Sequence, residues 1–179
     1  MNLHDELLLR NGGNWVTPPE TVTWFPEYKL ARDAIVREYE GVECWGFKDP
    51  RTLFTLDGWL EKFPDINLIG IFRHPHSVAL SLNRRNADLS IEDGYGIWLA
   101  YNRKLIHYWE RYGFPVLRFE TADFLDKFSG LIDHFGLDAA RRGEWESVYD
   151  VSLHHVTSSP VRMPEEVVNI FDKLRAIAS

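Results

Sequence analysis

The sequence predicts an α/β domain in which a parallel sheet is covered by helices on both of its faces. Strand-like runs and helical patterns alternate along the chain, which is the order that builds parallel sheets. Residues 67–72 are almost entirely apolar, as is typical of a parallel strand buried on both sides. The 179 residues, 45% of them hydrophobic, suffice for a single domain with a sizeable core.

Hydrophobic spacing and capping residues predict the elements of the first third of the chain. Asn2 can cap a first helix, which stops at Gly12, and a loop with three prolines follows. A second helix carries apolar residues at helical spacing and ends at Gly41. The predicted elements are a helix over 2–10, a loop over 15–26, a helix over 26–40, a strand over 42–47 and a helix over 52–63.

The same signals predict the elements of the remaining chain. Pro75 stands in the first turn of one helix, Ser90 is expected to cap the longest helix, and Thr121 to cap the next. Gly94 and Gly96, near the start of the longest helix, each cost about 1 kcal/mol relative to alanine. The predicted elements are strands over 67–72 and 115–119, helices over 74–84, 91–112, 121–135, 139–148 and 164–178, and a loop around 154–155.

Charge and composition exclude several classes of protein. A net charge of −7 disfavours nucleic acid as a partner. The chain has no apolar run of 18 residues and no signal-peptide pattern, so no membrane partner is expected and the cytoplasm is the predicted location. The single cysteine, Cys44, excludes an internal disulfide and fits a reducing compartment. We expect it to be a small buried residue of the strand over 42–47.

Two polar segments stand where a strand-like run is expected to meet the start of a helix. The first is residues 48–51 (Lys-Asp-Pro-Arg), and the second is residues 73–81, which begin Arg-His-Pro. Open α/β folds bind ligands at the edge where strands end and helices begin. Amides of the helix that Pro75 opens would also face a ligand there. The sequence therefore predicts a phosphate or sulfate site lined by Lys48, Arg51, Arg73 and Ser81.

Residues 43–105 resemble the bacterial branch of the sulfotransferase-like family. Members of this family use 3'-phosphoadenosine 5'-phosphosulfate as the sulfuryl donor and have a P-loop nucleotide hydrolase-like fold. The resemblance implies transfer to a hydroxyl or amine of a small-molecule or carbohydrate acceptor, and weaker similarity continues through residues 116–120. The blocks that agree in order are residues 45–51, 59–60, 71–75, 81–85 and 98–102.

Three residues are expected to bind the donor, two of them by resemblance and Arg51 by its position. Arg73 and Ser81 match the arginine and serine that hold the 3'-phosphate, and Arg51 is expected at the same donor site. The residues alone leave other interpretations open. Arg73 could be a surface arginine whose stem lies on the core, and Ser81 a small packing residue.

The resemblance also implies catalytic roles near residue 48. Lys48 matches the lysine that contacts the transferring sulfuryl group, where it would stabilise charge on the bridging oxygen. Many members have a histidine shortly after this lysine as the base, but Pro50 stands there, so Asp49 is the nearest candidate. Its ordinary pKa of about 3.9 would have to be raised. Alternatively, Lys48 pairs with Asp49, or the Asp-Pro-Arg corner caps the next helix. No metal is expected, because His154 and His155 lack further ligands at metal spacing.

One part of the family pattern is absent from these residues. The family begins with a strand and a loop rich in glycine, serine and threonine that holds the 5'-phosphosulfate, and the 179 residues contain no such cluster. The resemblance therefore implies an N-terminally truncated domain over 1–179 that is a poor enzyme by itself. A missing central strand would leave backbone groups unpaired, so a homodimer that fills the gap is possible. A non-catalytic nucleotide- or anion-binding module and a structural remnant are the alternative functions.

Overall fold

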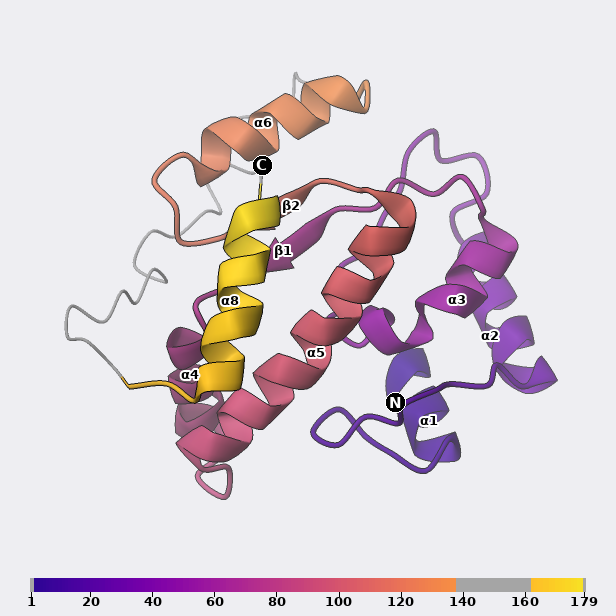
Figure 1. Cartoon of the computed structure of the whole chain (residues 1–179). Helices are drawn as coiled ribbons and strands as arrows, with labels where there is room; N and C mark the ends of the chain where they lie inside the picture. Colours follow the sequence, from indigo (N-terminus) through magenta and orange to yellow (C-terminus); the bar gives the residue numbers. More distant parts are fainter. Residues whose placement is uncertain (1, 138–161, 179) are drawn as a thin grey trace. The chain divides into compact units, whose positions relative to one another are not determined.

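The computed structural model describes residues 2–137 and 162–178, and the chain divides into two compact units. The N-terminal unit comprises residues 1–66 and the C-terminal unit residues 67–179. The described residues form seven helices and one parallel sheet of two strands (Figure 1). The N-terminal unit is helical, whereas the C-terminal unit has an α/β arrangement.

Three helices make up the N-terminal unit: α1 (Leu3–Arg10), α2 (Pro26–Arg37) and α3 (Thr52–Lys62). The side chain of Asn2 accepts a hydrogen bond from the His4 amide, which confirms the predicted cap of α1. Gly12 has a φ of +80°, a left-handed conformation that suits the residue after a helix end. All three helices lie within the ranges that hydrophobic spacing predicts.

The core of the N-terminal unit forms where α3 meets Trp24. The indole Nε1 of Trp24 donates a hydrogen bond to the Thr55 carbonyl over 3.1 Å, and Gly58 lets the ring lie directly against the helix. The guanidinium of Arg32, which is almost fully buried, lies over the same ring and donates to the Gly58 carbonyl. In consequence α2 buries an arginine, while its apolar residues Leu30 and Ile35 are exposed.

The predicted strand over residues 42–47 is wrong, because this segment forms neither helix nor strand. Its side chains pack on nearby rings instead: Trp45 stacks on Tyr39 and Phe47 lies 4.6 Å from the Trp59 ring. The expectation that Cys44 is buried is also wrong, because its side chain is exposed. An apolar run becomes a strand only where a neighbouring strand supplies hydrogen-bond partners, which periodicity does not report.

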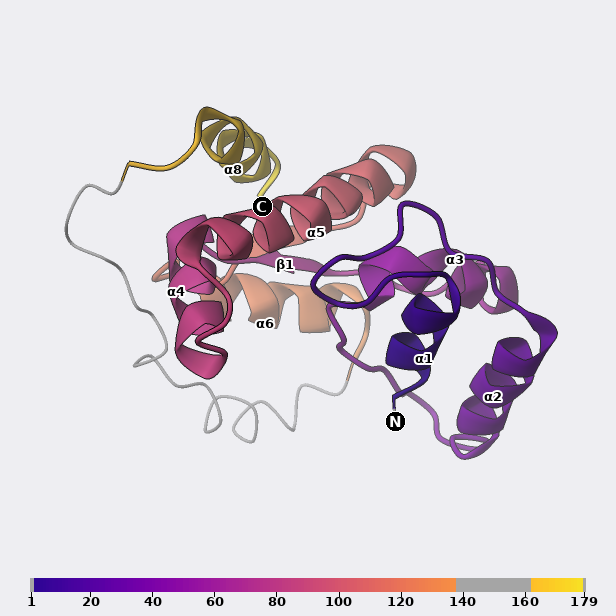
Figure 2. The same cartoon turned by 90° about the horizontal axis from the view of Figure 1, so that it is seen from below.

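In the C-terminal unit, strands β1 (Gly70–Phe72) and β2 (Val116–Arg118) pair in parallel, with Gly70 opposite Val116 and Phe72 opposite Arg118. Helices α5 (Ile91–Tyr112) and α8 (Glu165–Ile177) lie on one side of the strands and α6 (Phe124–His134) on the other (Figure 2). Helix α4 (Pro75–Arg85) packs against α5. The expected α/β arrangement with helices on both faces is therefore confirmed for this unit, around a two-stranded sheet.

The ends of α5 agree with the sequence analysis. The Ser90 hydroxyl accepts from the Asp93 amide, the Asp93 carboxylate accepts from the Ser90 amide, and Gly113 ends the helix with a φ of +66°. Gly94 does more than weaken the helix. A Cβ atom at this position would lie 2.6 Å from the Cα of Ala79 in α4. The glycine is therefore what allows α4 and α5 to pack closely.

The start of α6 differs from the prediction. Asp123 occupies the N-cap position without a side-chain cap bond, while the Thr121 hydroxyl donates to the Arg118 carbonyl over 3.0 Å. Thr121 therefore closes the turn after β2 and leaves α6 uncapped by a side chain. The predicted helix over 139–148 and the pair His154-His155 lie outside the described residues.

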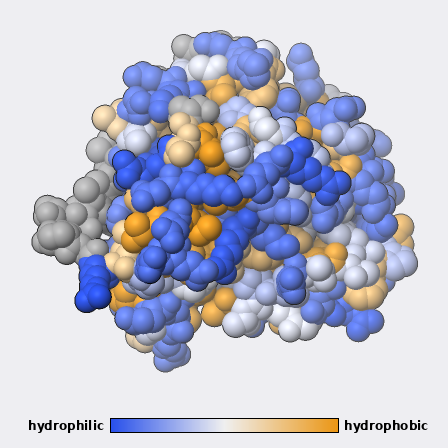
Figure 3. All heavy atoms as spheres, in the orientation of Figure 1, coloured by the Kyte–Doolittle hydropathy of each residue, from blue (hydrophilic) through white to orange (hydrophobic). Residues whose placement is uncertain are grey.

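Hydrophilic and apolar residues are interspersed on the face of the molecule shown in Figure 3. No helix among residues 2–137 and 162–178 is both long enough and apolar enough to span a bilayer.

Candidate functional site

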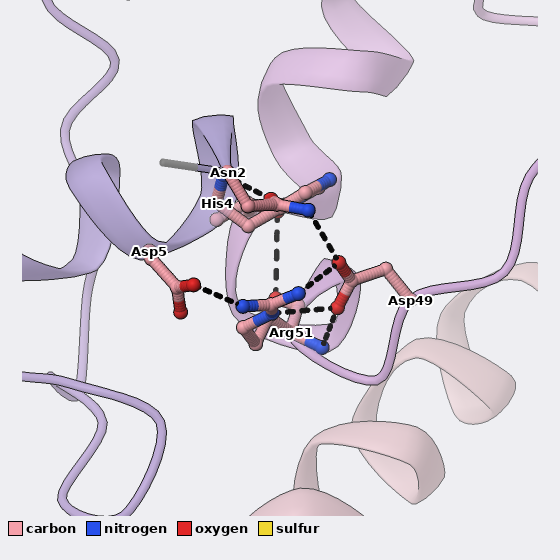
Figure 4. Close-up of polar contacts among 6 residues, drawn as sticks. Asn2, His4, Asp5, Asp49 and Arg51 are labelled. Atoms are coloured by element: carbon pink, nitrogen blue, oxygen red, sulfur yellow. Dashed lines mark hydrogen bonds and ion pairs between the residues drawn. The ribbon is translucent and has the colours of Figure 1, made fainter.

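The N-terminal unit contains a polar cluster around Arg51, which we call the Arg51 cluster and which Figure 4 shows. The Arg51 guanidinium donates from Nε and Nη2 to the two oxygens of Asp49, over 2.8 and 2.7 Å, and its Nη1 pairs with Asp5. The Arg51 amide also donates to Asp49 Oδ1, over 2.9 Å. One arginine is therefore held by two carboxylates, and each of its guanidinium nitrogens faces a carboxylate oxygen.

Two further contacts complete the Arg51 cluster. The Asn2 side-chain amide donates to Asp49 Oδ2 over 3.5 Å, and Nδ1 of His4 lies 2.7 Å from the Thr55 hydroxyl. His4 is buried against the rings of the unit's core. Burial lowers the pKa of His4 most strongly, and Arg51 lowers it further, against the raising effect of Asp49 and Asp5.

The Arg51 cluster makes Asp49 a weaker base than a free aspartate. Burial by itself raises the pKa of Asp49, but the hydrogen bonds from the Arg51 side chain and amide outweigh it, and the pKa falls below its ordinary value. The pKa of Arg51 is raised, foremost by its hydrogen bond to Asp49. These contacts favour a structural Asp-Pro-Arg corner over a catalytic Asp49, although Arg51, at the N-cap position of α3, makes no side-chain cap bond. Lys48, immediately before it, is exposed.

The C-terminal unit carries a second cluster at the carboxyl ends of its strands. This strand-end cluster comprises Arg73, His74, Arg118 and Glu120. The Glu120 side chain is only 1% exposed. Its Oε1 accepts from the His74 amide over 2.8 Å and lies 3.5 Å from Arg73 Nε, while its Oε2 lies 3.8 Å from Arg118 Nε. Here one carboxylate stands between two arginines.

Aromatic rings support both arginines of the strand-end cluster. The Arg73 guanidinium lies 4.9 Å from the Phe119 ring centre, and that of Arg118 lies 5.1 Å from the Phe171 ring centre in α8. The Trp98 indole donates to the Arg73 carbonyl over 3.0 Å and so fixes the backbone at the end of β1. Both arginine side chains remain partly accessible, 31% and 27% exposed respectively.

The amino end of α4 is already partly satisfied by the protein. Pro75 occupies the first turn as predicted, and Nδ1 of the N-cap residue His74 accepts from the His76 amide over 3.3 Å. Burial, ahead of the opposing effect of Glu120, lowers the pKa of His74, so its ring is neutral at neutral pH. Because one amide at this helix end is already bonded, the favourable effect of α4 on an anion comes mainly from its dipole. The Arg73 side chain supplies hydrogen-bond donors.

The structure distributes the predicted site residues between the units. Lys48, Asp49 and Arg51 belong to the N-terminal unit, where Asp49 and Arg51 are in direct contact. Arg73 directly follows β1, whereas Ser81 is the seventh residue of α4, about 9 Å along the helix axis from its first residue. Ser81 is half-buried, and its carbonyl accepts from the Arg85 side chain.

The sequence analysis did not assign a role to Arg118 or Glu120, although one signal could have identified them. Both are charged residues at the end of a predicted strand, as Arg73 is. Parallel pairing brings such ends to one edge, so the rule that selects Arg73 selects Arg118 as well.

Comparisons with protein families, with curated proteins and with solved structures find no match for this chain.

Proposed function

We propose that the chain is a sulfotransferase-like protein whose strand-end cluster binds the 3'-phosphate of a 3'-phosphoadenosine nucleotide. The observation that carries this proposal is the position of Arg73 between the carboxyl end of β1 and the amino end of α4. Parallel α/β sheets bind ligands at this edge, and both the guanidinium and the helix dipole favour an anion there. The resemblance of residues 71–85 to the family's 3'-phosphate segment supports the same assignment.

The reaction proposed for the protein is sulfuryl transfer from 3'-phosphoadenosine 5'-phosphosulfate. An acceptor hydroxyl or amine attacks sulfur in line, the sulfur–oxygen bond to the 5'-phosphate breaks, and 3'-phosphoadenosine 5'-phosphate leaves. The resemblance assigns to Lys48, which is exposed, the stabilisation of charge at the bridging oxygen. The lowered pKa of Asp49 makes it a poor proton acceptor, so in this proposal Asp49 orients Arg51 and the base is another group.

A nucleotide- or anion-binding module without catalysis is the second candidate. The observation that favours it is that the charged groups of the Arg51 cluster are already paired with one another, because Arg51 donates two hydrogen bonds to Asp49. Under this alternative the strand-end cluster keeps its ligand, and Lys48 has no role.

Calorimetric titration of the full chain with 3'-phosphoadenosine 5'-phosphate tests the binding proposal. We expect binding that is at least tenfold tighter than that of adenosine 5'-phosphate. Arg73→Ala should weaken it by about 10- to 100-fold, the effect of losing a charge-assisted hydrogen bond. Arg84→Ala, which removes the same charge from the exposed end of α4, is the matched control and should leave binding unchanged.

Two outcomes would contradict the proposal. Equal affinity for the two nucleotides would mean that the 3'-phosphate is not recognised. Equal loss in Arg73→Ala and Arg84→Ala would mean that the chain attracts the nucleotide only through general positive charge. A product assay with the sulfate donor and phenolic, carbohydrate and amine acceptors then separates the transferase from the binding module.

A further inference from the structure

We propose that Arg118 is a second phosphate ligand beside Arg73, and that Glu120 is an internal counter-ion that sets the strength of anion binding. The inference rests on the proposed function and identifies the chemical group that the site takes: a phosphate monoester held by two arginines.

Parallel pairing is what brings the two arginines together. Arg118 ends β2 opposite Phe72, and Arg73 is the next residue after Phe72 along β1. Both guanidinium groups approach the same carboxylate, with their Nε atoms 3.5 and 3.8 Å from the two oxygens of Glu120. A group that replaced or joined this carboxylate would therefore meet both guanidinium groups.

The contact between Arg118 and Glu120 is incomplete. At 3.8 Å it is an ion pair without a hydrogen bond, and both Arg118 Nε and Glu120 Oε2 are buried without a hydrogen-bond partner among the described residues. Buried polar atoms in native proteins nearly always have a partner, so an unsatisfied pair indicates an additional group at this position. A phosphate oxygen can accept from Arg118, and a phosphate hydroxyl or a bridging water can donate to Glu120.

The charge of the strand-end cluster fits an anion. Within the described residues of the cluster, two guanidinium groups face the carboxylate of Glu120, and His74 is neutral at neutral pH because burial lowers its pKa. The cluster therefore has a net charge of one positive unit, to which the amino end of α4 adds. Planar guanidinium groups match the oxygens of a phosphate monoester, which can accept two hydrogen bonds from each.

The arginines are also held in place before any ligand binds. Phe119 lies under one guanidinium and Phe171 under the other, so each side chain has lost part of its rotational freedom. Glu120, fixed by the His74 amide, keeps the two like charges close together. Such an arrangement lowers the entropy that a ligand would otherwise lose on binding.

The test compares Arg118→Gln and Glu120→Gln with wild type, using the full chain and 3'-phosphoadenosine 5'-phosphate. The glutamine in Arg118→Gln keeps a stem over Phe171, and the one in Glu120→Gln keeps a carbonyl acceptor for the His74 amide, so both variants should fold. We expect Arg118→Gln to weaken binding by about tenfold or more. Glu120→Gln should strengthen it by roughly tenfold, because one negative charge near the phosphate is removed. Arg111→Gln, on the exposed end of α5, is the matched control.

A second readout separates ligand contact from damage to the fold. The ratio of affinities for 3'-phosphoadenosine 5'-phosphate and adenosine 5'-phosphate should fall in Arg118→Gln, whereas partial unfolding would reduce both affinities equally. If Arg73→Ala loses this discrimination and Arg118→Gln keeps it, the two-arginine site is overturned while the proposed function stands. If wild type shows no discrimination, the proposed function itself fails. Weaker binding by Glu120→Gln would overturn the counter-ion role.

Discussion

The Arg51 cluster and the strand-end cluster are both built from arginines and carboxylates, but in opposite proportions. In the first, one arginine donates hydrogen bonds to Asp49 and forms an ion pair with Asp5. In the second, Glu120 faces two arginines at 3.5 and 3.8 Å. The residues of the Arg51 cluster carry one excess negative charge and hydrogen-bond to one another. Those of the strand-end cluster carry one excess positive charge, and Arg118 Nε and Glu120 Oε2 have no hydrogen-bond partner in the part of the chain that the structure describes.

Under the proposed function, this difference separates a structural arginine, Arg51, from one that binds a ligand, Arg73. Two arginines, each after a strand-like run, looked equivalent in the sequence. Once its carboxylate partners are counted, Arg51 stabilises the fold, because moving it to an anion would leave two carboxylates uncompensated. Arg73 can contact an anion while its partner carboxylate stays bound to the His74 amide.

The largest effect should come from breaking the support of the strand-end cluster. Gly94→Ala would place a methyl group 2.6 Å from the Ala79 Cα, so α4 must move away from α5. We expect a loss of about 1–3 kcal/mol in the free energy of unfolding of the C-terminal unit, the usual cost of overpacking. Urea unfolding with hydrogen exchange over residues 67–137 would measure it.

Gly96→Ala is the control for this prediction. Among the described residues, no atom outside the adjoining helix backbone lies within 4 Å of the added methyl group, and alanine is the better helix former, so stability should rise by up to about 1 kcal/mol. If the two alanines had the same effect, the close packing of α4 on α5 would not be what positions the strand-end cluster.

An intermediate effect should distinguish the clusters themselves. Asp49→Asn removes the charge that Arg51 pairs with but keeps an acceptor for the Arg51 amide. It should cost about 1–2 kcal/mol of stability, because the charged hydrogen bond from the Arg51 guanidinium is weakened while the amide bond is kept. Arg118→Gln removes an ion pair that has no hydrogen bond, and Glu120 keeps the His74 amide as a donor, so this variant should cost less than Asp49→Asn. Equal costs in urea unfolding would remove the distinction between a structural and a ligand-binding cluster.

The smallest effect concerns pH and the N-terminal unit. The pKa of His4 is lower in the folded chain than its ordinary value of 6.5, so folding favours the neutral ring. The contribution is complete above the unfolded pKa and is lost as the pH falls below it. We therefore expect the N-terminal unit to be less stable at pH 5.5 than at pH 7.5, with the loss beginning at about pH 6.5, the ordinary pKa of histidine.

NMR-detected urea unfolding of wild type and His4→Gln at these two pH values would measure the effect. The glutamine can still bond the Thr55 hydroxyl but does not titrate, so the pH dependence of the N-terminal unit should become smaller. The C-terminal unit, with His74 also lowered in pKa, should keep its own dependence in both proteins and serves as the internal reference. An unchanged dependence in the variant would exclude His4 as its source.

Local signals predicted the helices well because each helix carries its own evidence. Asn2 and Ser90 begin helices by accepting hydrogen bonds from amides two or three residues later, and Gly113 ends a helix through its own positive φ. The strand over 42–47 was predicted wrongly because a strand depends on a partner distant in sequence. The apolar residues at helical spacing predicted α2 correctly, but they did not identify its buried face, because the buried residue is Arg32.

The sequence by itself determined the described helices to within a few residues at their ends, strands over 67–72 and 115–119 that contain β1 and β2, and the position of Arg73 between a strand and a helix. Only the tertiary structure decided which charges meet. It joined Asp5 to Arg51 across 46 residues of chain and brought Arg118 and Glu120 beside Arg73. Caps and periodicity act over a few residues, whereas the charge balance of a site depends on segments that meet only when the chain folds.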